Sequence, residues 1–389
     1  MNLRRLAFAL LVVMGAVASG RAASAAGGLA VIDASTDFRR LRWSIDPRPV
    51  LTRGGEGSID RGVVGDPCIV WDDELDTWRM FYFANGHHPH TGARGPRTAM
   101  ALAASAEQIG PGDWRKVGLL GFTNPAALIN PNDYHKWWVV MDAGRPNRAS
   151  RIEEKYWAVF TASKRMPGGR MQKHIQAAHA EKLAGPWTLL AQPIIAPEPG
   201  RLDSLHADTP SAFWFTDRKQ IAIFYKGYPI EGQATQPGSA FGSGTLVAAW
   251  NPSEPRARNV RVVMRAAQGR GWNQGWMSSI QLLGGPTLGW FGLHNGSPTP
   301  PADQSHREPA PSLGGWVVCD GDPFEGSWRP DGSSSPFVYP DKLTPPENAA
   351  GLGVNFWRHH LLVTPQGNAR IFFNSGSYGA EQMYSLVPP

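Results

Sequence analysis

Short apolar runs alternate with polar turns along most of the chain, a pattern typical of β-strands joined by tight connections. In the first pair, residues 66–71 and 78–83 are apolar or aromatic, and the polar segment 72–77 separates them. Four further pairs begin at residues 124, 208, 277 and 354. The pattern therefore predicts five similar units, each opening with two antiparallel strands.

Most units continue with a third strand, and several then reach a fourth strand that begins at a tryptophan. Third strands are expected at residues 100–104, 176–180, 244–250 and 314–319. The tryptophan motif follows at Gly112-Asp113-Trp114, Gly185-Pro186-Trp187 and Gly326-Ser327-Trp328. Four antiparallel strands per unit, repeated around an axis, form a β-propeller. We therefore predict an all-β fold, a five-bladed β-propeller with four antiparallel strands per blade.

The composition supports this fold class. The 389 residues include 44 Gly and 34 Pro without a Gly-X-Y period, which excludes collagen and disfavours long helices. With 42% hydrophobic residues and 16 Trp, the chain has enough apolar material to bury a sizeable core. Two cysteines are too few for a disulfide scaffold or a Cys-rich zinc site. We expect Cys68 and Cys319 to be buried free thiols, with one long-range bridge as the alternative.

The N-terminal segment has the features of a secretory signal peptide. Arg4 and Arg5 precede the apolar run 6–18, which is too short to span a bilayer, and small residues occupy 22–25. We predict a signal peptide at 1–25, so the mature protein is expected to be secreted or periplasmic. Residues 26–60 are expected to form an extension that closes or precedes the propeller of residues 61–389.

The charge pattern gives no sign of a nucleic-acid partner. The net charge is +6, part of which lies in the predicted leader, and no run rich in Lys or Arg is present. We expect no nucleic-acid partner, no membrane contact after the leader is removed, no cofactor and a monomer. His87 and His88 are expected to contact a sugar rather than a metal ion.

The loops of a propeller alternate between the two faces of the ring. With the strand order above, four long connections share one face with Asp66 and Asp208, namely 85–97, 142–154, 227–242 and 294–313. Long loops at one mouth of a rigid scaffold usually carry function. The turns that follow the first strands, such as 130–135, are expected on the opposite face with solvated charges.

Three short motifs resemble the five-bladed propeller glycoside hydrolases, the group that includes the family 43 arabinanases and xylosidases. They are Gly65-Asp66-Pro67 in the first unit, Ala207-Asp208-Thr209-Pro210 in the third, and the strand ending Gly185-Pro186-Trp187. The resemblance covers roughly residues 61–389. It implies that Asp66 acts as base or nucleophile and that Asp208 tunes the acid and orients the sugar.

The chain departs from the pattern of this family at two places. Gln274-Gly275-Trp276-Met277 stands where the proton-donating Glu is expected, and Gly353-Val354-Asn355 replaces the usual Gly-His-Asn. Cleavage of a glycosidic bond needs one protonated and one ionised group. Glu308 is the first candidate for the missing acid, followed by Glu231 and His206.

We therefore predict an exported glycoside hydrolase that cleaves a poly- or oligosaccharide, with Asp66, Asp208 and Glu308 as its catalytic residues. Further residues are expected to bind the carbohydrate: His87, His88, Asp142, Arg145, His206, Glu231, Trp276, His294, Asn295, Asn355, Trp357 and Arg358. Two alternatives stay open. One is a glycoside phosphorylase that holds phosphate with Arg145, Arg148 or Arg307, and the other is a non-catalytic carbohydrate-binding propeller.

Overall fold

The chain is almost entirely β-structure. The computed structural model describes residues 37–229, 243–266, 271–285, 287–298, 312–332, 356–376 and 379–388. Its helices in these ranges are three short 3-10 turns, η1 (Phe38–Arg40), η2 (Pro125–Ala127) and η4 (Gly271–Asn273). The prediction of an all-β fold is thus confirmed. None of the helices described is long and apolar enough to cross a lipid bilayer.

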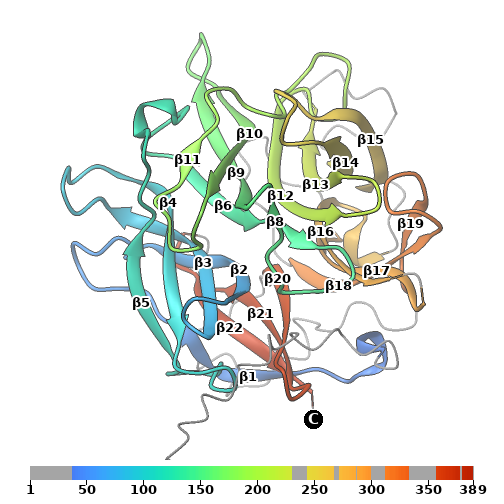
Figure 1. The fold of residues 1–389 in the computed structure, drawn as a ribbon, viewed down its shortest axis with the longest axis horizontal. Helices are drawn as coiled ribbons and strands as arrows, with labels where there is room; N and C mark the ends of the chain where they lie inside the picture. The colour runs from blue at the N-terminus through green and yellow to red at the C-terminus, as the bar shows by residue number, and fades with distance from the viewer. Residues whose placement is uncertain are drawn as a thin grey trace, which may run out of the picture.

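Three sheets have four antiparallel strands each (Figure 1). The first is β2 (Val63–Asp72), β3 (Thr77–His87), β4 (Arg94–Ala103) and β5 (Trp114–Leu119). The second is β16 (Trp276–Gly285), β17 (Gly289–Ser297), β18 (Leu313–Asp320) and β19 (Ser327–Pro330). The third is β20 (Trp357–Val363), β21 (Ala369–Ser375), β22 (Gln382–Val387) and β1 (Ser44–Leu51). Because β1 pairs with β22, the third sheet joins the beginning of the described chain to its end.

The remaining strands form a ten-stranded sheet made of two antiparallel runs. One run is β6 (Tyr134–Val139), β9 (Lys155–Arg165), β10 (Met171–Ala180) and β11 (Thr188–Leu189). The other is β12 (His206–Phe215), β13 (Gln220–Tyr228), β14 (Gly244–Trp250) and β15 (Arg258–Arg265). The two runs are joined through one parallel pair, Lys173 with His206. The short strands β7 (Met141–Asp142) and β8 (Arg151–Ile152) complete the sheet.

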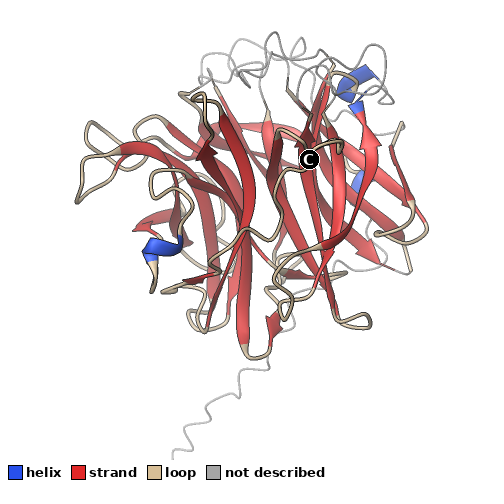
Figure 2. Cartoon of the chain, turned by 90° about the horizontal axis from the view of Figure 1, so that it is seen from above, coloured by secondary structure: helices blue, strands red, loops and turns tan. Residues whose placement is uncertain are grey.

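The first strands of these runs pack against one another in a closed ring. β2 contacts β6, β6 contacts β12, β12 contacts β16, β16 contacts β20, and β20 contacts β2. They are the innermost strands in Figure 1. Strands β2, β12 and β20 are buried along nearly their whole length, and the buried side chains of β20 include Arg358, His359 and His360. In the perpendicular view of Figure 2, the strands run between two ends of the molecule at which loops gather.

Aromatic side chains fill the space between neighbouring sheets. Trp137 stacks on Phe160 with ring centroids 4.8 Å apart and meets Trp187 edge-on at 5.1 Å. Phe81 of β3 lies 6.4 Å from Trp137 and so connects the first sheet to the next run. Contacts of this kind bury large apolar areas and hold adjacent sheets together.

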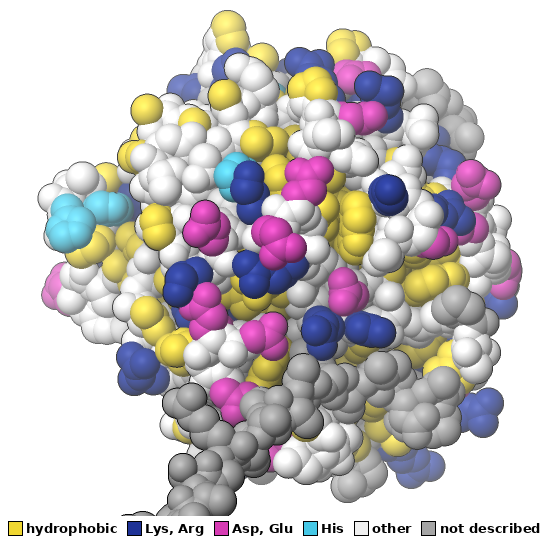
Figure 3. All heavy atoms as spheres, in the orientation of Figure 1, with side chains coloured by type: hydrophobic (Ala, Val, Ile, Leu, Met, Phe, Trp, Pro, Cys, Tyr) yellow, Lys and Arg dark blue, Asp and Glu magenta, His cyan; other side chains and the backbone are white. Residues whose placement is uncertain are grey.

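Two smaller observations concern the cysteines and the surface. Cys68 and Cys319 are both buried and free, which confirms the expected state of these thiols. On the face drawn in Figure 3, Lys and Arg side chains are interspersed with Asp and Glu.

One strand assignment from the sequence is wrong. The segment 124–129 was expected to be the first strand of the second unit, but it contains the 3-10 turn η2, with Pro125 at its first position. Proline fixes φ and lacks an amide hydrogen, so it suits the start of such a turn; in the inner strands β2 and β12 it occurs only where the ladder is interrupted, at Pro67 and Pro210. The inner strand is β6, and the expected second strand 137–141 largely overlaps it. This shift by one strand reverses the direction of the chain in that unit.

The loop between β7 and β8 closes the ring at one end. The buried Asn147 amide donates hydrogen bonds to the Ile69 carbonyl of β2 (3.1 Å) and the Leu361 carbonyl of β20 (3.0 Å). Its oxygen accepts one from the Val363 amide (3.3 Å). Asn147 has a left-handed φ of 66°, which Asn tolerates better than most residues. This side chain therefore ties two inner strands together.

We expect Asn147→Gly to lower the free energy of unfolding by about 2–4 kcal/mol, because buried backbone groups on two strands lose their partners. Glycine accepts the left-handed φ, so the effect isolates the hydrogen bonds from backbone strain. Urea unfolding measures it, with the exposed turn residue Asn368→Gly as the control. Equal midpoints for the two variants would contradict the role assigned to Asn147.

Candidate active site

A cavity of about 280 Å³ lies where the inner strands begin. Its ionisable lining residues in the described part of the chain are Asp66, Asp133, His135, Lys136, Lys173, Asp208, Lys226, Arg358 and Glu381. Trp276, Trp357, Phe83 and Tyr228 supply aromatic surface, and Asn85, Asn295 and Asn374 supply amides. The cavity thus combines carboxylates, ammonium groups and aromatic rings.

Each inner strand has a bulge that directs a side chain into this cavity. The ladder of each inner strand is interrupted just where one residue lines the cavity; these residues are Asp66, Lys136, Thr209, Ser278 and Arg358. Four of them have left-handed φ values, 47° at Asp66, 57° at Lys136, 54° at Thr209 and 47° at Arg358. Bulges re-aim side chains near active sites, and non-glycine residues in this region often mark function.

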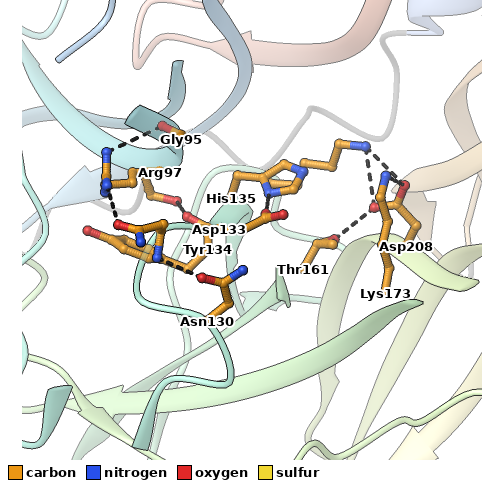
Figure 4. Close-up of polar contacts among 12 residues, drawn as sticks. Gly95, Arg97, Asn130, Asp133, Tyr134, His135, Thr161, Lys173 and Asp208 are labelled. Atoms are coloured by element: carbon orange, nitrogen blue, oxygen red, sulfur yellow. Dashed lines mark hydrogen bonds and ion pairs between the residues drawn. The ribbon is translucent and has the colours of Figure 1, made fainter. Parts of the chain in front are cut away.

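Asp208 is held by two lysine ammonium groups and the hydroxyl of Thr161 (Figure 4). Its Oδ2 lies 2.7 Å from Lys173 Nζ and 3.1 Å from Lys136 Nζ, and its Oδ1 accepts a hydrogen bond of 3.0 Å from Thr161. Burial alone raises the pKa of Asp208, but Lys136 and Lys173 hold it well below the usual value. Asp208 is therefore an ionised carboxylate with its oxygens engaged.

Asp66 has a different environment. Its backbone amide donates to Asn374 Oδ1 (3.1 Å), which fixes β2 against the third sheet. The preceding Gly65 allows this contact, because a Cβ there would lie 2.5 Å from Asn374 Cγ. None of the described residues donates a hydrogen bond to the Asp66 carboxylate, although the residue is only 7% exposed. Its oxygens are available to a ligand in the cavity.

Arg358 lies within electrostatic range of both aspartates. Its Nη2 donates to the Pro210 carbonyl (2.6 Å), and the guanidinium carbon lies 5.1 Å from the centroid of the Trp138 ring. Burial lowers the pKa of Arg358, and the negative charges of Asp66 and Asp208 oppose that shift. The guanidinium therefore connects the two carboxylates electrostatically.

Two further groups of interacting side chains line the cavity wall. Asp133 Oδ1 lies 2.7 Å from His135 Nδ1 (Figure 4). Burial raises the pKa of Asp133, but His135, with Ser163 and Lys173, outweighs this effect and lowers it. Lys226 Nζ lies 3.9 Å from the centroid of the Trp276 ring and 4.5 Å from that of Tyr228. An ammonium over these rings is a cation–π contact, which orients the lysine at the cavity wall. Within the described ranges no group of three His, Cys, Asp or Glu side chains is placed to hold a metal ion.

The structure brings together only part of the residue set expected from the sequence. Six of the expected residues line the cavity: Asp66, Asp208, Trp276, Asn295, Trp357 and Arg358. Glu308, Glu231 and Asn355 lie outside the described residues.

The expected histidines do not line the cavity. His206 is buried behind it, where its Nδ1 accepts a hydrogen bond from the Lys173 amide (3.0 Å). His294 faces a separate small interior space, and burial lowers its pKa to about 3, so the ring is neutral. His87 ends β3 and accepts a hydrogen bond from Arg94 (2.7 Å), and His88 follows it outside the cavity.

The sequence analysis expected Asp142 and Arg145 at the cavity, and this prediction is wrong, because neither residue lines it. Asp142 pairs with Trp214, six residues along β12 from Asp208, or about 20 Å at the usual rise per residue. At this far end it accepts a hydrogen bond from the Ser150 hydroxyl and forms an ion pair with the Arg148 guanidinium (3.7 Å). The cause is the misassigned strand: with β6 as the inner strand, the loop after it emerges opposite the cavity.

Several cavity residues were not expected from the sequence. Asp133 and His135 belong to the turn 130–135 that the sequence predicts on the opposite face, and Lys136 follows that turn; His135 and Lys136 lie on β6. The strongly apolar run from Trp137 was the signal that this segment is an inner strand. Lys226 was detectable as a lysine within the apolar strand β13. Glu381 stands in no motif, and the sequence offers no signal for it.

Comparison with known proteins finds relatives by fold but none by sequence. No family model and no curated protein matches this sequence. Among solved structures, the chain is similar to one described as a glycoside hydrolase, with a TM-score of 0.62 and 10% identity over 90% of this chain and 94% of that one. It is also similar to a thermostable family-43 glycoside hydrolase (TM-score 0.56, 13% identity, 87% and 91% covered).

A third similar structure is an α-L-arabinofuranosidase from Podospora anserina in complex with cellotriose (TM-score 0.53, 10% identity, 90% and 98% covered). At these identities the likeness concerns the fold. The chain has the β-propeller-type fold of these glycoside hydrolases.

We expect Asp208→Asn to lower the free energy of unfolding by about 3 kcal/mol near neutral pH, because two lysine ammonium groups lose their carboxylate. The pKa of Asp208 is depressed, so its contribution is complete above the usual value of 3.8 and is lost as the pH falls toward the folded-state value. The gap between wild type and variant should therefore narrow below about pH 4.

Thermal unfolding of both proteins from about pH 7 to pH 3 measures this gap. The exposed turn variant Asp217→Asn is the control and should follow the wild type throughout. A constant gap across the range would contradict the ionised state assigned to Asp208.

Proposed function

We propose that this protein is an exported glycoside hydrolase, and that Asp66 and Asp208 are the two carboxylates at the core of its site. The observation that carries the proposal is their contrast within one cavity. Asp208 is engaged by Lys136 and Lys173, whereas the Asp66 carboxylate is free of hydrogen bonds from the described residues. Glycoside cleavage needs a carboxylate that can reach the anomeric carbon and polar groups that orient the sugar, and the two aspartates can meet these two needs separately.

The two aspartates take different parts in the reaction. Asp66 faces the anomeric carbon as base toward water or as nucleophile, since its oxygens are available and Arg358 lies within electrostatic range. Asp208 stays ionised, so it does not supply a proton. With its two lysines it presents a fixed polar wall that orients sugar hydroxyls. Trp276 and Trp357 line the same cavity and offer apolar surface to a sugar ring.

We also propose that the propeller has five blades. The closed ring of β2, β6, β12, β16 and β20 supports this count, as does the division of the ten-stranded sheet into two antiparallel runs joined at one residue pair. In this arrangement residues 61–389 form the propeller, and β1 of the preceding extension completes the last blade.

Export and substrate are part of the same proposal. A signal peptide at 1–25 places the mature, monomeric protein outside the cytoplasm, where a poly- or oligosaccharide is the substrate. Structures with similar folds include enzymes described as an endo-1,4-beta-xylanase and an endo-arabinase, which makes pentose polymers the first substrates to test.

The mature protein should release sugar from at least one member of a panel of 4-nitrophenyl glycosides, arabinan and xylan oligosaccharides. We expect Asp66→Asn to lower kcat on that substrate by a factor on the order of 10³ or more, because the group facing the anomeric carbon is lost. Asp73→Asn, in the exposed turn at the other end of β2, should keep wild-type activity.

Three other outcomes would contradict this proposal, and two of them would favour a different function. Full activity in Asp66→Asn would remove Asp66 from the reaction. Turnover that requires inorganic phosphate would favour a phosphorylase that uses the cavity lysines. Oligosaccharide binding by calorimetry without release of reducing ends would favour a binding propeller.

A further inference from the structure

We propose that Glu381 is the proton donor of the reaction; this inference rests on the proposed glycosidase function. Glu381 lies directly before β22 and lines the same cavity as Asp66. Its backbone carbonyl accepts a hydrogen bond from the Val64 amide (3.0 Å), which holds it beside β2, two residues before Asp66. The residue is 5% exposed, so its carboxyl group belongs to the interior of the site.

The other carboxyl groups of the cavity are unsuited to donate a proton. Four described carboxyl residues line it, namely Asp66, Asp133, Asp208 and Glu381. Lys136 and Lys173 lower the pKa of Asp208, and His135 lowers that of Asp133, in each case against the effect of burial. Both are therefore ionised at neutral pH, and Asp66 with Glu381 remains as the working pair.

The surroundings of Asp66 suit it to the role of base or nucleophile, which leaves the role of acid to Glu381. Asp66 lies within electrostatic range of the Arg358 guanidinium, which suits the carboxylate that must be charged. The ammonium groups of Lys136 and Lys173 are directed to Asp208 from β6 and β10. Glu381 reaches the cavity from the third sheet, where it precedes β22 and its backbone pairs with β2.

This placement explains how the site can work without a glutamate at the start of β16. Ser278, at the bulge of that strand, lines the cavity with a hydroxyl where the family pattern predicts a carboxyl nearby. Glu381 offers a carboxyl group to the same space from a different sheet. A proton donor is defined by its reach to the glycosidic oxygen, and its position in the chain is free to differ.

The reaction balances with these two groups and one water molecule. As the bond between the anomeric carbon and the glycosidic oxygen breaks, its electron pair stays on that oxygen, which takes the proton of Glu381. Water supplies the oxygen of the new bond to the anomeric carbon, either directly or after attack by Asp66. One proton of that water is released to the carboxylates and restores Glu381.

The test compares two leaving groups on the same sugar, using whichever glycone the substrate panel identifies. Loss of the acid should matter for an oligosaccharide, whose leaving alcohol needs a proton, and little for a 2,4-dinitrophenyl glycoside. We expect Glu381→Gln to lower kcat/KM by about 10²–10⁴-fold on the oligosaccharide and by less than about tenfold on the dinitrophenyl glycoside. The alkaline limb of the pH profile should also disappear.

Three further variants complete the experiment. Glu381→Asp keeps an acid at a shorter reach, so it should fold like the wild type and lose less activity than Glu381→Gln, again mostly on the oligosaccharide. Glu325→Gln changes an exposed glutamate far along the chain and should be neutral. Glu308→Gln tests the donor expected from the sequence.

The proposal is overturned if Glu381→Gln keeps full activity on the oligosaccharide, or if it loses activity equally on both leaving groups. It is also overturned if Glu308→Gln alone shows the dependence on the leaving group. In these cases the glycosidase stands as long as Asp66→Asn is inactive on both substrates. If the wild type cleaves no glycoside at all, the proposed function itself is wrong, and the role of Glu381 falls with it.

Discussion

The closed ring of inner strands is the constraint on which the rest of this structure depends. Each inner strand packs on two others, so its first residues are forced to meet those of its neighbours around one space. A bulge at the same place in each strand then turns a side chain into that space, and two of these side chains are Asp66 and Arg358. Residues almost three hundred positions apart in the sequence thereby become neighbours.

The carboxyl groups that line this shared cavity have different electrostatic environments. Lys136 and Lys173 converge on Asp208, which fixes it as an ionised and fully engaged carboxylate. Asp66 and Glu381 line the cavity from the first and third sheets. Carboxyl groups placed in such different environments can differ in protonation at one pH, and this difference is what acid and base catalysis requires.

The repeated strand pattern was sufficient to predict the all-β fold and the meeting of Asp66 with Asp208, because both lie in apolar runs that open a unit. The strand pattern led to a wrong prediction in the second unit. There Asn124-Pro125 was interpreted as the start of the first strand, and the apolar run from Trp137 as the second strand, whereas this run belongs to the inner strand β6. That single error reversed the faces, so Asp142 was placed in the site and His135 outside it. Glu381 was beyond prediction, since its role depends on the pairing of the last sheet with β2 and on no local motif.

The most direct measurement is a crystal structure of the mature protein with the sugar released from its substrate. We expect the sugar in the cavity between Asp66 and Asp208. A carboxyl oxygen of Asp66 should face its anomeric carbon, and the Trp276 side chain should lie in van der Waals contact with the sugar. A sugar bound at the opposite end of the ring, near Asp142 and Asn147, with an empty cavity at Asp66, would contradict this assignment of the site.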